Sequence, residues 1–473
     1  MKKSCLLLLL LVMTLYSWAD ITDDVIAAGL PVLSITTENQ EEPTCDYIFA
    51  PEGCFGISTV NQNKVPGRAV LTVNGQKTFD SGDYVKGVSG MTIRIRGNTS
   101  AYYSSKKPYK IELEKKNDLL VRDNDKYNDK NWILIDEGND GLNTLIGLKM
   151  NEIMGLGGWT PAYQFVNLFI NDDYRGIYML LESIRRNPDC RLNVDKKSGY
   201  IFESDAYWWK EDVYFSSDAG VKYTFKYPDS EDITPQQIDY IRQAVNAMEQ
   251  SFGSGSYDDY IDVTSFATWI LAHDILGTFD SAGANIYLTK YDSSDDTKIA
   301  MSTLWDFNSI MKTTNQWSRV RSDENFYFKQ LFTDTNFTNT YWNIWQQKSD
   351  SIFMQMTDFI RKFAASETAA ALQKSRPYDG QRWQYEPSTV NENIQEALTW
   401  FTERQQWMNN YYSPSSIHYP HFTIHHPLST IHHPQHTIHN ITGQRVDSRV
   451  PKPGIYIING KKILISSAQA SAQ

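Results

Sequence analysis

Short runs of alternating apolar and polar residues dominate the first part of the chain. Alternation of this kind predicts β-strands with one buried face, and it occurs at 70–73, 91–96 and 109–113. Asn74-Gly75 follows the first run, and this dipeptide is a strong hairpin signal. The segment 164–181 predicts two more strands around a turn at 171–173.

Helical spacing of apolar residues takes over further along the chain. It first appears at 143–154, where Gly155 and Gly157 predict the helix end. From Thr234 onwards the helical pattern dominates, and Pro235 fits the first turn of a helix. Further helices are predicted at 264–276, 341–363 and 391–412. A β-rich first half and a mainly helical second half predict an α+β fold.

The composition and the net charge of the chain exclude some classes of protein and some classes of partner. The chain has 473 residues, of which 41% are hydrophobic and 21% charged. These values predict a folded chain, long enough for one large domain or two to three smaller ones. The formal net charge of -11 argues against nucleic-acid partners and against direct binding to anionic lipid, since both need clustered Lys and Arg.

The first nineteen residues have the pattern of an export signal. Lys2 and Lys3 precede the apolar run 5–15, and Ser17-Trp18-Ala19 fits a small-x-small cleavage site. The apolar run is too short to cross a bilayer, and no other segment predicts a transmembrane span. We therefore expect residues 1–19 to be removed and the mature protein to be periplasmic, cell-surface or secreted.

Three cysteines remain after removal of the signal. Cys45 and Cys54 flank a segment containing Pro51 and Gly53, which predicts a turn. In an oxidising compartment these two thiols predict either a disulfide or two free thiols, because sequence does not supply their separation. Cys190 has no predicted partner.

The C-terminal part differs in composition. Residues 413–439 hold eight of the nine histidines in a Pro-containing near-repeat, which indicates a linker, with metal capture as the alternative. Residues 440–473 regain β character and predict a small hairpin from 454–458 and 461–465 around Asn459-Gly460.

Candidate chemistry lies in the second half. Asp280 and Asn285 have the D-x-x-x-x-N spacing of a kinase catalytic loop, and Asp306 follows a strand-like run. In kinases such an Asp accepts the substrate hydroxyl proton, while Asn and a later Asp bind magnesium. Asp280 as a helix cap or turn residue is the alternative interpretation.

Basic residues that fit a phosphate site lie in the first half. Arg94 and Arg96 share one face of a predicted strand, next to the turn 97–100, and Lys107 and Lys110 lie on the next strand. The alternative interpretation is that these residues are solvent-facing charges and do not contact phosphate. For Lys106 we prefer this alternative. Glu182 ends an apolar strand. It has three possible roles there: to cap the strand, to pair with a Lys, or to line the hinge between two lobes.

Together these motifs resemble the CotH family of spore coat protein H kinases. The resemblance runs from about residue 90 to 407. It rests on R-I-R-G-N-T-S at 94–100, K-K-P-Y-K-I-E-L at 106–113, N-D-D-Y-R-G-I-Y at 171–178 with Glu182, Asp280 with Asn285, and W-D-F at 305–307.

The resemblance implies a two-lobed atypical protein-kinase-like fold at 90–412, preceded by a β-rich segment at 20–89. It also implies transfer of phosphate from ATP to Ser or Thr of a secreted or surface protein, with Mg²⁺ or Mn²⁺. Asp280 would be the catalytic residue and Asn285, Asp306 and Asn308 metal ligands. Arg94, Arg96, Lys107, Lys110 and Glu182 would contact the nucleotide.

Two positions depart from the family pattern. Thr278 replaces an Asn that commonly stands two residues before the catalytic Asp, and Asn308 replaces the second Asp of W-D-x-D. An amide still binds magnesium but brings no negative charge. A catalytically weak or silent kinase-like scaffold, acting as a surface binding or adhesion module, is therefore the alternative function.

Two weaker resemblances remain. Residues 444–460 are similar to the C-terminal sorting tails of secreted Bacteroidetes proteins, although the chain continues past their usual end. Glycan binding by Trp208, Trp209 or Trp269 has less support, because tryptophans more often lie in cores.

Overall fold

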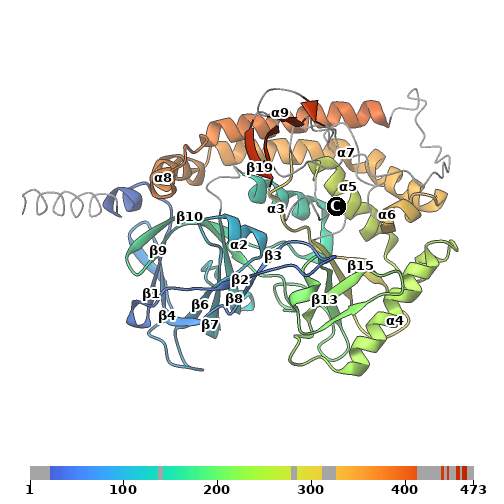
Figure 1. Ribbon diagram of the computed structural model, residues 1–473, viewed down its shortest axis with the longest axis horizontal. Helices are drawn as coiled ribbons and strands as arrows, with labels where there is room; N and C mark the ends of the chain where they lie inside the picture. Colours follow the sequence, from blue (N-terminus) through green and yellow to red (C-terminus); the bar gives the residue numbers. More distant parts are fainter. Residues whose placement is uncertain are drawn as a thin grey trace, which may run out of the picture. The chain divides into compact units, whose positions relative to one another are not determined.

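The computed structural model describes residues 22–136, 142–278, 285–311 and 326–412, together with four strands between 438 and 465. The predicted signal peptide, Asp280 and most of the predicted linker lie outside these residues. The chain divides into two compact units, residues 1–418 and 419–473. Helices and sheets are both present, which confirms the α+β class (Figure 1).

The first sheet closes into a barrel-like structure. Its order is β1-β9-β10-β8-β7-β6-β4-β5, and β1 also pairs with β4, so that seven strands form a ring with β5 outside it. All neighbours are antiparallel except β1 and β9. The strands are β1 (Val32–Thr37), β4 (Val65–Val73), β5 (Gln76–Asp80), β6 (Met91–Ile95), β7 (Tyr109–Asn117), β8 (Asp129–Asp136), β9 (Tyr163–Ile170) and β10 (Asp173–Glu182).

Alternating burial explains why these strands close into a ring. Val65, Ala69 and Leu71 of β4 are buried in the barrel core, and the alternate residues Pro66, Arg68 and Val70 are more exposed. Asn74 and Gly75 both have positive φ, of 50° and 74°, as the turn of a tight β-hairpin requires. The predicted Asn-Gly turn is therefore confirmed, and it joins β4 to β5.

Strand β10 is buried on both faces. Tyr178 and Leu180 belong to the barrel core, whereas Ile177, Met179 and Leu181 belong to the larger core outside the barrel. This explains the continuous apolar run at 176–181, since a strand covered on both sides needs no alternation.

A second sheet has the order β12-β13-β11-β14-β15. Phe202, Tyr223 and Leu288 on one face join the core formed with the helices. Its strands are β11 (Tyr200–Ser204), β12 (Tyr214–Ser216), β13 (Lys222–Tyr227), β14 (Ile286–Lys290) and β15 (Ile299–Met301). The sequence analysis predicted none of β11, β12 and β13, all of which precede Thr234.

The helices largely follow the predicted pattern. They are α2 (Thr99–Tyr103), α3 (Asn143–Met154), α4 (Pro235–Ser251), α5 (Val263–Leu276), α6 (Phe326–Leu331), α7 (Thr335–Ala364), α8 (Glu367–Trp383) and α9 (Val390–Tyr411). Helix α3 has its predicted bounds, and Pro235 occupies the first turn of α4. Trp269 is buried in the core, as tryptophans more often are. No helix among the described residues is long and apolar enough to span a membrane.

A small hairpin, β2 (Asp46–Phe49) with β3 (Ile57–Val60), separates two of the cysteines. Cys45 precedes β2, and Cys54 lies in the loop at the other end of that strand. Four residues of strand span on the order of 10 Å, more than the roughly 7 Å limit between disulfide-linked Cα atoms. Both thiols are free, as is that of Cys190.

The second unit contains a separate four-stranded sheet. It comprises β16 (Ile438–Asn440), β17 (Arg445–Val446), β18 (Gly454–Ile458) and β19 (Lys461–Ile465), in the order β17-β16-β18-β19. Strands β18 and β19 pair in antiparallel fashion, as their sequence predicted.

Candidate active site

Two of the predicted metal ligands lie side by side. Asn285 immediately precedes β14, and its amide nitrogen lies 3.4 Å from Oδ2 of Asp306, which follows β15. Both residues adopt positive φ, of 58° and 61°, a conformation that Asn and Asp tolerate better than most residues. Asn308, in contrast, is exposed to solvent.

Helix α3 fixes the segment that carries Asp306. Asn151 is fully buried, and its Oδ1 accepts a hydrogen bond of 2.8 Å from the backbone N–H of Leu304. Phe307 packs so closely against Gly147 that a Cβ there would lie 2.0 Å from its ring. The backbone N–H of Met311 donates to the carbonyl of Leu276 at the end of α5. The segment that carries Asp306 is thus held from both sides, and no sequence pattern indicated these roles of Asn151 and Gly147.

Asp280 lies outside the described residues, between two anchored positions. Helix α5 ends at Gly277 in the left-handed conformation. The next residue, Thr278, is buried, with its hydroxyl 2.8 Å from Nδ1 of His273. Asn285 resumes the chain beside Asp306. The family's Asn at position 278 is therefore replaced by a residue that bonds back to α5.

Three cations on the barrel have side chains without a partner. Arg94 and Arg96 lie on and just after β6, and Lys110 lies directly opposite Arg94 on β7. Among the described residues none of these side chains makes a hydrogen bond or an ion pair, although all three are half-buried. Burial, with Arg94 nearby, lowers the pKa of Lys110 to about 8. A cationic group of this kind suits an anion such as a phosphate.

The second sheet faces these cations with charges that the sequence analysis missed. Glu203 of β11 and Lys226 of β13 form an ion pair of 2.8 Å, and the Lys226 ammonium lies 6.0 Å from the ring centre of Tyr287 on β14. Burial lowers the pKa of Lys226, but Glu203 and Asp205 outweigh it, so the net pKa is raised. Acidic and basic residues within otherwise apolar strands were the sequence signal that could have identified this ion pair.

Arg96 connects the two groups electrostatically. Burial lowers the pKa of its guanidinium, and Tyr287, Asp306 and Glu203 act in the opposite direction. Arg96 is therefore within electrostatic range of both Asp306 and Glu203, the acidic members of the two pairs. These residues come from three segments of the chain, 94–110, 203–226 and 285–306.

Lys107 and Lys106 are engaged elsewhere. The Lys107 ammonium donates to the carbonyl oxygens of Ala101 and Ser104, at 2.6 and 2.7 Å, where it caps the C-terminal end of α2. Lys106 is not a surface charge as expected. It is buried and forms ion pairs with Asp136 and Asp379 at 2.7 and 2.8 Å.

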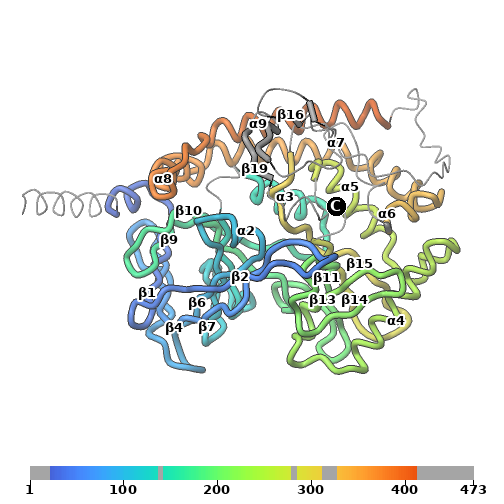
Figure 2. The backbone as a smooth tube through the Cα atoms, viewed as in Figure 1, coloured from blue at the N-terminus to red at the C-terminus, as the bar shows by residue number. Residues whose placement is uncertain are grey.

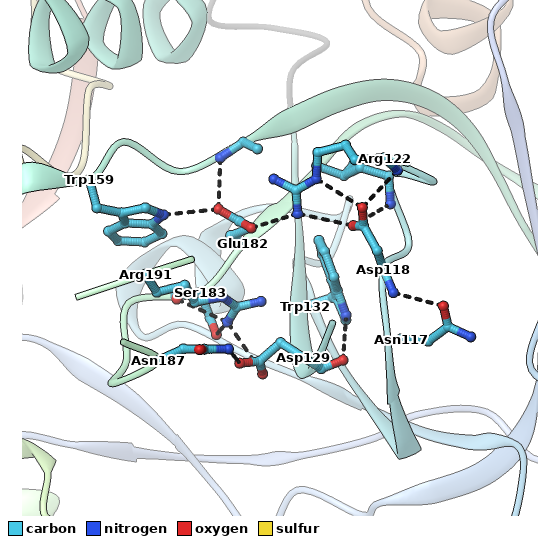
Figure 3. A network of polar contacts seen from close by, with 12 residues as sticks. Asn117, Asp118, Arg122, Asp129, Trp132, Trp159, Glu182, Ser183, Asn187 and Arg191 are labelled. Carbon is cyan, nitrogen blue, oxygen red and sulfur yellow. Dashed lines mark hydrogen bonds and ion pairs between the residues drawn. The ribbon is translucent and has the colours of Figure 1, made fainter. Parts of the chain in front are cut away.

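Glu182 is a buried carboxylate with both oxygens bound by the protein (Figure 3). Arg122 donates to Oε1 at 2.8 Å, and the indole of Trp159 and the backbone N–H of Ala162 donate to Oε2 at 3.0 and 3.1 Å. Of the three predicted roles, pairing with a cation is the one observed, and the cation is an Arg rather than a Lys.

The region has the donor types that magnesium and a nucleotide need. Magnesium prefers oxygen ligands and usually takes one or two from carboxylates, the rest coming from water and substrate phosphates. Asp306 and Asn285 supply such oxygens. In the described ranges no cluster of three or more His, Cys, Asp or Glu side chains forms a complete metal cage, so phosphate oxygens and water would have to complete the shell.

Comparison with known proteins agrees with the motifs. No curated protein matches the chain. The profile of the family described as CotH kinase protein matches residues 93–408, which is more than half of the chain and includes every predicted site residue. This chain belongs to the CotH kinase family.

Proposed function

We propose that the protein is an exported kinase that transfers the terminal phosphate of ATP to Ser or Thr of a secreted or surface protein, with Mg²⁺ or Mn²⁺. The observation that carries this proposal is Arg96, a cation that makes no hydrogen bond or ion pair among the described residues and lies within electrostatic range of Asp306, with Arg94 and Lys110 beside it on the barrel. Family membership makes a kinase-like protein the starting point.

Each group has a role in the proposed reaction. Arg94, Arg96 and Lys110 neutralise phosphate oxygens, and Lys226, oriented by Glu203, adds a further cation. Asp306 and Asn285 hold the divalent ion, which neutralises charge on the transferred group. Asp280 accepts the proton of the acceptor hydroxyl. The hydroxyl oxygen bonds to the γ-phosphorus at the same time as the bond between that phosphorus and ADP breaks.

The architecture supports the same proposal. We take the barrel as the phosphate-binding lobe and the helical part, with the second sheet, as the lobe that carries the metal ligands. Residues 1–19 direct export, which places the mature chain, starting at Asp20, with secreted acceptors.

Incubation of the mature chain with radiolabelled ATP and Mg²⁺ or Mn²⁺ tests this function. Label should appear on the protein or an added acceptor and be lost in Asp280→Ala and in Asp306→Ala. Asp239→Ala is the control, because Asp239 is an exposed residue of α4 that pairs only with Arg242. Absence of transfer, together with no rise in melting temperature on adding ATP, would overturn the proposal.

A silent scaffold is the second candidate, because position 308 carries an exposed Asn instead of an Asp. It predicts nucleotide-induced stabilisation without phosphoryl transfer. Asn308→Asp discriminates between the two. If the shortage of negative charge limits metal binding, this substitution should restore or increase transfer, whereas a scaffold would stay inactive.

A further inference from the structure

Apolar side chains gather at the surface on the β2–β3 hairpin and on α2. Phe49 and Phe55 are each 67% exposed and Tyr103 is 73% exposed, with Ile48 and Tyr102 at 38%. Phe49 and Tyr102 form an edge contact with ring centres 5.9 Å apart, and Tyr102 contacts Tyr103 at 5.0 Å. We call Phe49, Tyr102 and Tyr103, whose rings are in contact, the hairpin patch. Contiguous exposed aromatic surface of this kind marks interaction sites.

The hairpin is hydrogen-bonded to the segment that follows β6. Ser58 donates to the side chain of Asn98 at 2.9 Å, and Thr59 donates to the carbonyl of Gly97 at 2.7 Å. Gly97 immediately follows Arg96, one of the unpaired cations. The hairpin is thus attached to the segment that follows Arg96, one of the proposed phosphate-binding residues.

The hairpin also contacts the second sheet. The indole of Trp209 donates to the carbonyl of Phe55 at 3.1 Å, and the rings of Phe55 and Tyr207 are 6.2 Å apart. Lys210 donates to Asn98 at 2.9 Å, and the hydroxyls of Thr99 and Tyr207 are hydrogen-bonded. Figure 2 shows β2 and β3 running from the barrel towards the second sheet. Contacts on both sides fix the position of the hairpin patch relative to the site.

One edge of β2 has no strand partner. Among the described residues β2 pairs only with β3, and Ile48 and Phe49 at this edge are exposed. An open strand edge offers alternate N–H and C=O groups to an extended chain, the arrangement used in β-strand addition. The edge therefore favours an extended polypeptide over a compact ligand.

The exposed charges on the hairpin itself and directly after Lys210 are acidic, while Lys210 is hydrogen-bonded to Asn98. Asp46 and Glu52 on the hairpin and Glu211 and Asp212 after Trp209 are all exposed. The nearby cation Lys107 is occupied by two carbonyl oxygens. Acidic surroundings repel anionic lipid and favour a partner that carries Lys or Arg.

We propose that the hairpin patch binds the acceptor protein through an extended segment with apolar side chains and flanking Lys or Arg, which adds along β2. This inference rests on the proposed function, because only a kinase has an acceptor protein to which the bound segment can belong. Binding itself is independent of catalysis and is measured separately.

Fluorescence anisotropy on the mature chain, without nucleotide, tests the proposal. The probes are three short labelled peptides of equal length. The first has alternating apolar residues, a single Ser and a pair of Lys at each end. The second has Asp in place of Lys, and the third has Asn in place of the apolar residues. The first should bind most tightly. Phe49→Ser/Tyr103→Ser should weaken its binding by about tenfold or more, as truncation of interface anchors does.

Val85→Ser/Val88→Ser is the matched control, since these valines are 52% and 49% exposed and belong to a different loop. This variant should bind the first peptide like the wild type. All three proteins should keep the same melting temperature and the same stabilisation by Mg-ATP, because none of the substituted side chains is part of the site.

The outcomes separate the two proposals. Equal affinity of the three peptides, absence of binding at millimolar concentration, or equal binding by wild type and Phe49→Ser/Tyr103→Ser would overturn the docking proposal. The docking proposal would also be overturned if the wild type formed a dimer, or bound phosphatidylcholine vesicles, and Phe49→Ser/Tyr103→Ser did not. Peptide binding without stabilisation by Mg-ATP would instead support docking and contradict the kinase function.

Discussion

Lys110 is a lysine with a lowered pKa and no anionic partner among the described residues. The charged groups around it are Arg94, Glu112, Arg185 and Lys64, of which three are cations. Its charged form is therefore destabilised until an anion binds. This makes Lys110 the residue at which pH dependence should be most visible.

We predict that nucleotide affinity falls as pH rises through about 8, the pKa of Lys110 in the free protein. Loss of the ammonium charge removes one phosphate contact, which corresponds to about a tenfold weaker affinity at pH 9 than at pH 7. Calorimetric titration with Mg-ATP at both pH values measures this. Lys110→Arg should flatten the dependence, and an unchanged pH profile in that variant would contradict the assignment.

Lys110 has the opposite effect on the stability of the free protein. The folded-state pKa of about 8 lies below the ordinary 10.5, so between these values the unfolded chain binds more protons. The free energy of unfolding should therefore rise with pH in this window. Lys110→Met should remove this rise and raise the melting temperature below pH 8, as a thermal denaturation series would show.

Glu203 orients the ammonium of Lys226 and is a positioning residue in the proposed reaction. Glu203→Gln keeps the size of the side chain but removes its charge, so the pKa of Lys226 should fall and its orientation loosen. We expect the KM for ATP to rise about tenfold, with metal affinity unchanged because Asp306 and Asn285 are intact. A loss of kcat alone would contradict this role. Glu203→Asp should recover part of the affinity.

At the scale of the elements, α3 determines where Asp306 lies. Its Asn151 binds the backbone at Leu304, and its Gly147 leaves the space that Phe307 fills. Phe307 is the residue after Asp306, so a shift of its ring moves the carboxylate. The position of Asp306, a proposed metal ligand, is thus set by a helix more than 150 residues earlier in the chain.

Gly147→Ala should weaken both stability and metal binding. The added Cβ would lie 2.0 Å from Phe307, and overpacking of a core usually costs about 1 to 3 kcal/mol. Denaturant unfolding and titration with Mn²⁺ in the presence of ATP would measure the two effects. Gly253→Ala is the control, because nothing lies within 4 Å of its Cβ position. Normal metal affinity in Gly147→Ala would show that Phe307 does not position Asp306.

At the scale of the whole molecule, α8 is tied to the barrel by buried charges. Lys106 on the barrel side pairs with Asp379 of α8, which also accepts the backbone N–H of Ile177 on β10 at 2.7 Å. Arg382 and Trp383 of α8 donate to backbone carbonyl oxygens of Tyr174 and Arg175. The C-terminal helices are thereby fixed to the strand that ends at Glu182.

Lys106→Met should destabilise the protein by about 3 to 5 kcal/mol, because it leaves the buried carboxylate of Asp379 and the partly exposed one of Asp136 without their cation. Chemical denaturation measures this loss. Lys106→Met/Asp379→Asn should recover part of it, since the amide still accepts the hydrogen bond from Ile177 but carries no charge. Equal losses in the single and double variants would indicate that lost packing, rather than charge, is responsible.

The sequence predicted elements whose pattern is local. Helix α3 and the Asn74-Gly75 turn were predictable because they depend on residues within one or two turns of chain. The second sheet was largely missed, since its strands lie far apart in sequence and only their pairing defines them. Helix α8 was missed because Pro377 and Gly380 interrupt the usual signals, while contacts with β10 stabilise it.

The sequence by itself determined the family, through ordered motifs that hold residue types with a specific chemistry. It named Arg94, Arg96, Lys110, Asn285 and Asp306, but gave no means of telling Lys107 from Lys110. Only the tertiary structure shows that the Lys107 ammonium is occupied by carbonyl oxygens, that Glu203 and Lys226 face the same region, and that Asn151 holds the metal-ligand segment. Those facts depend on distances between distant parts of the chain, which are set by packing and not by local pattern.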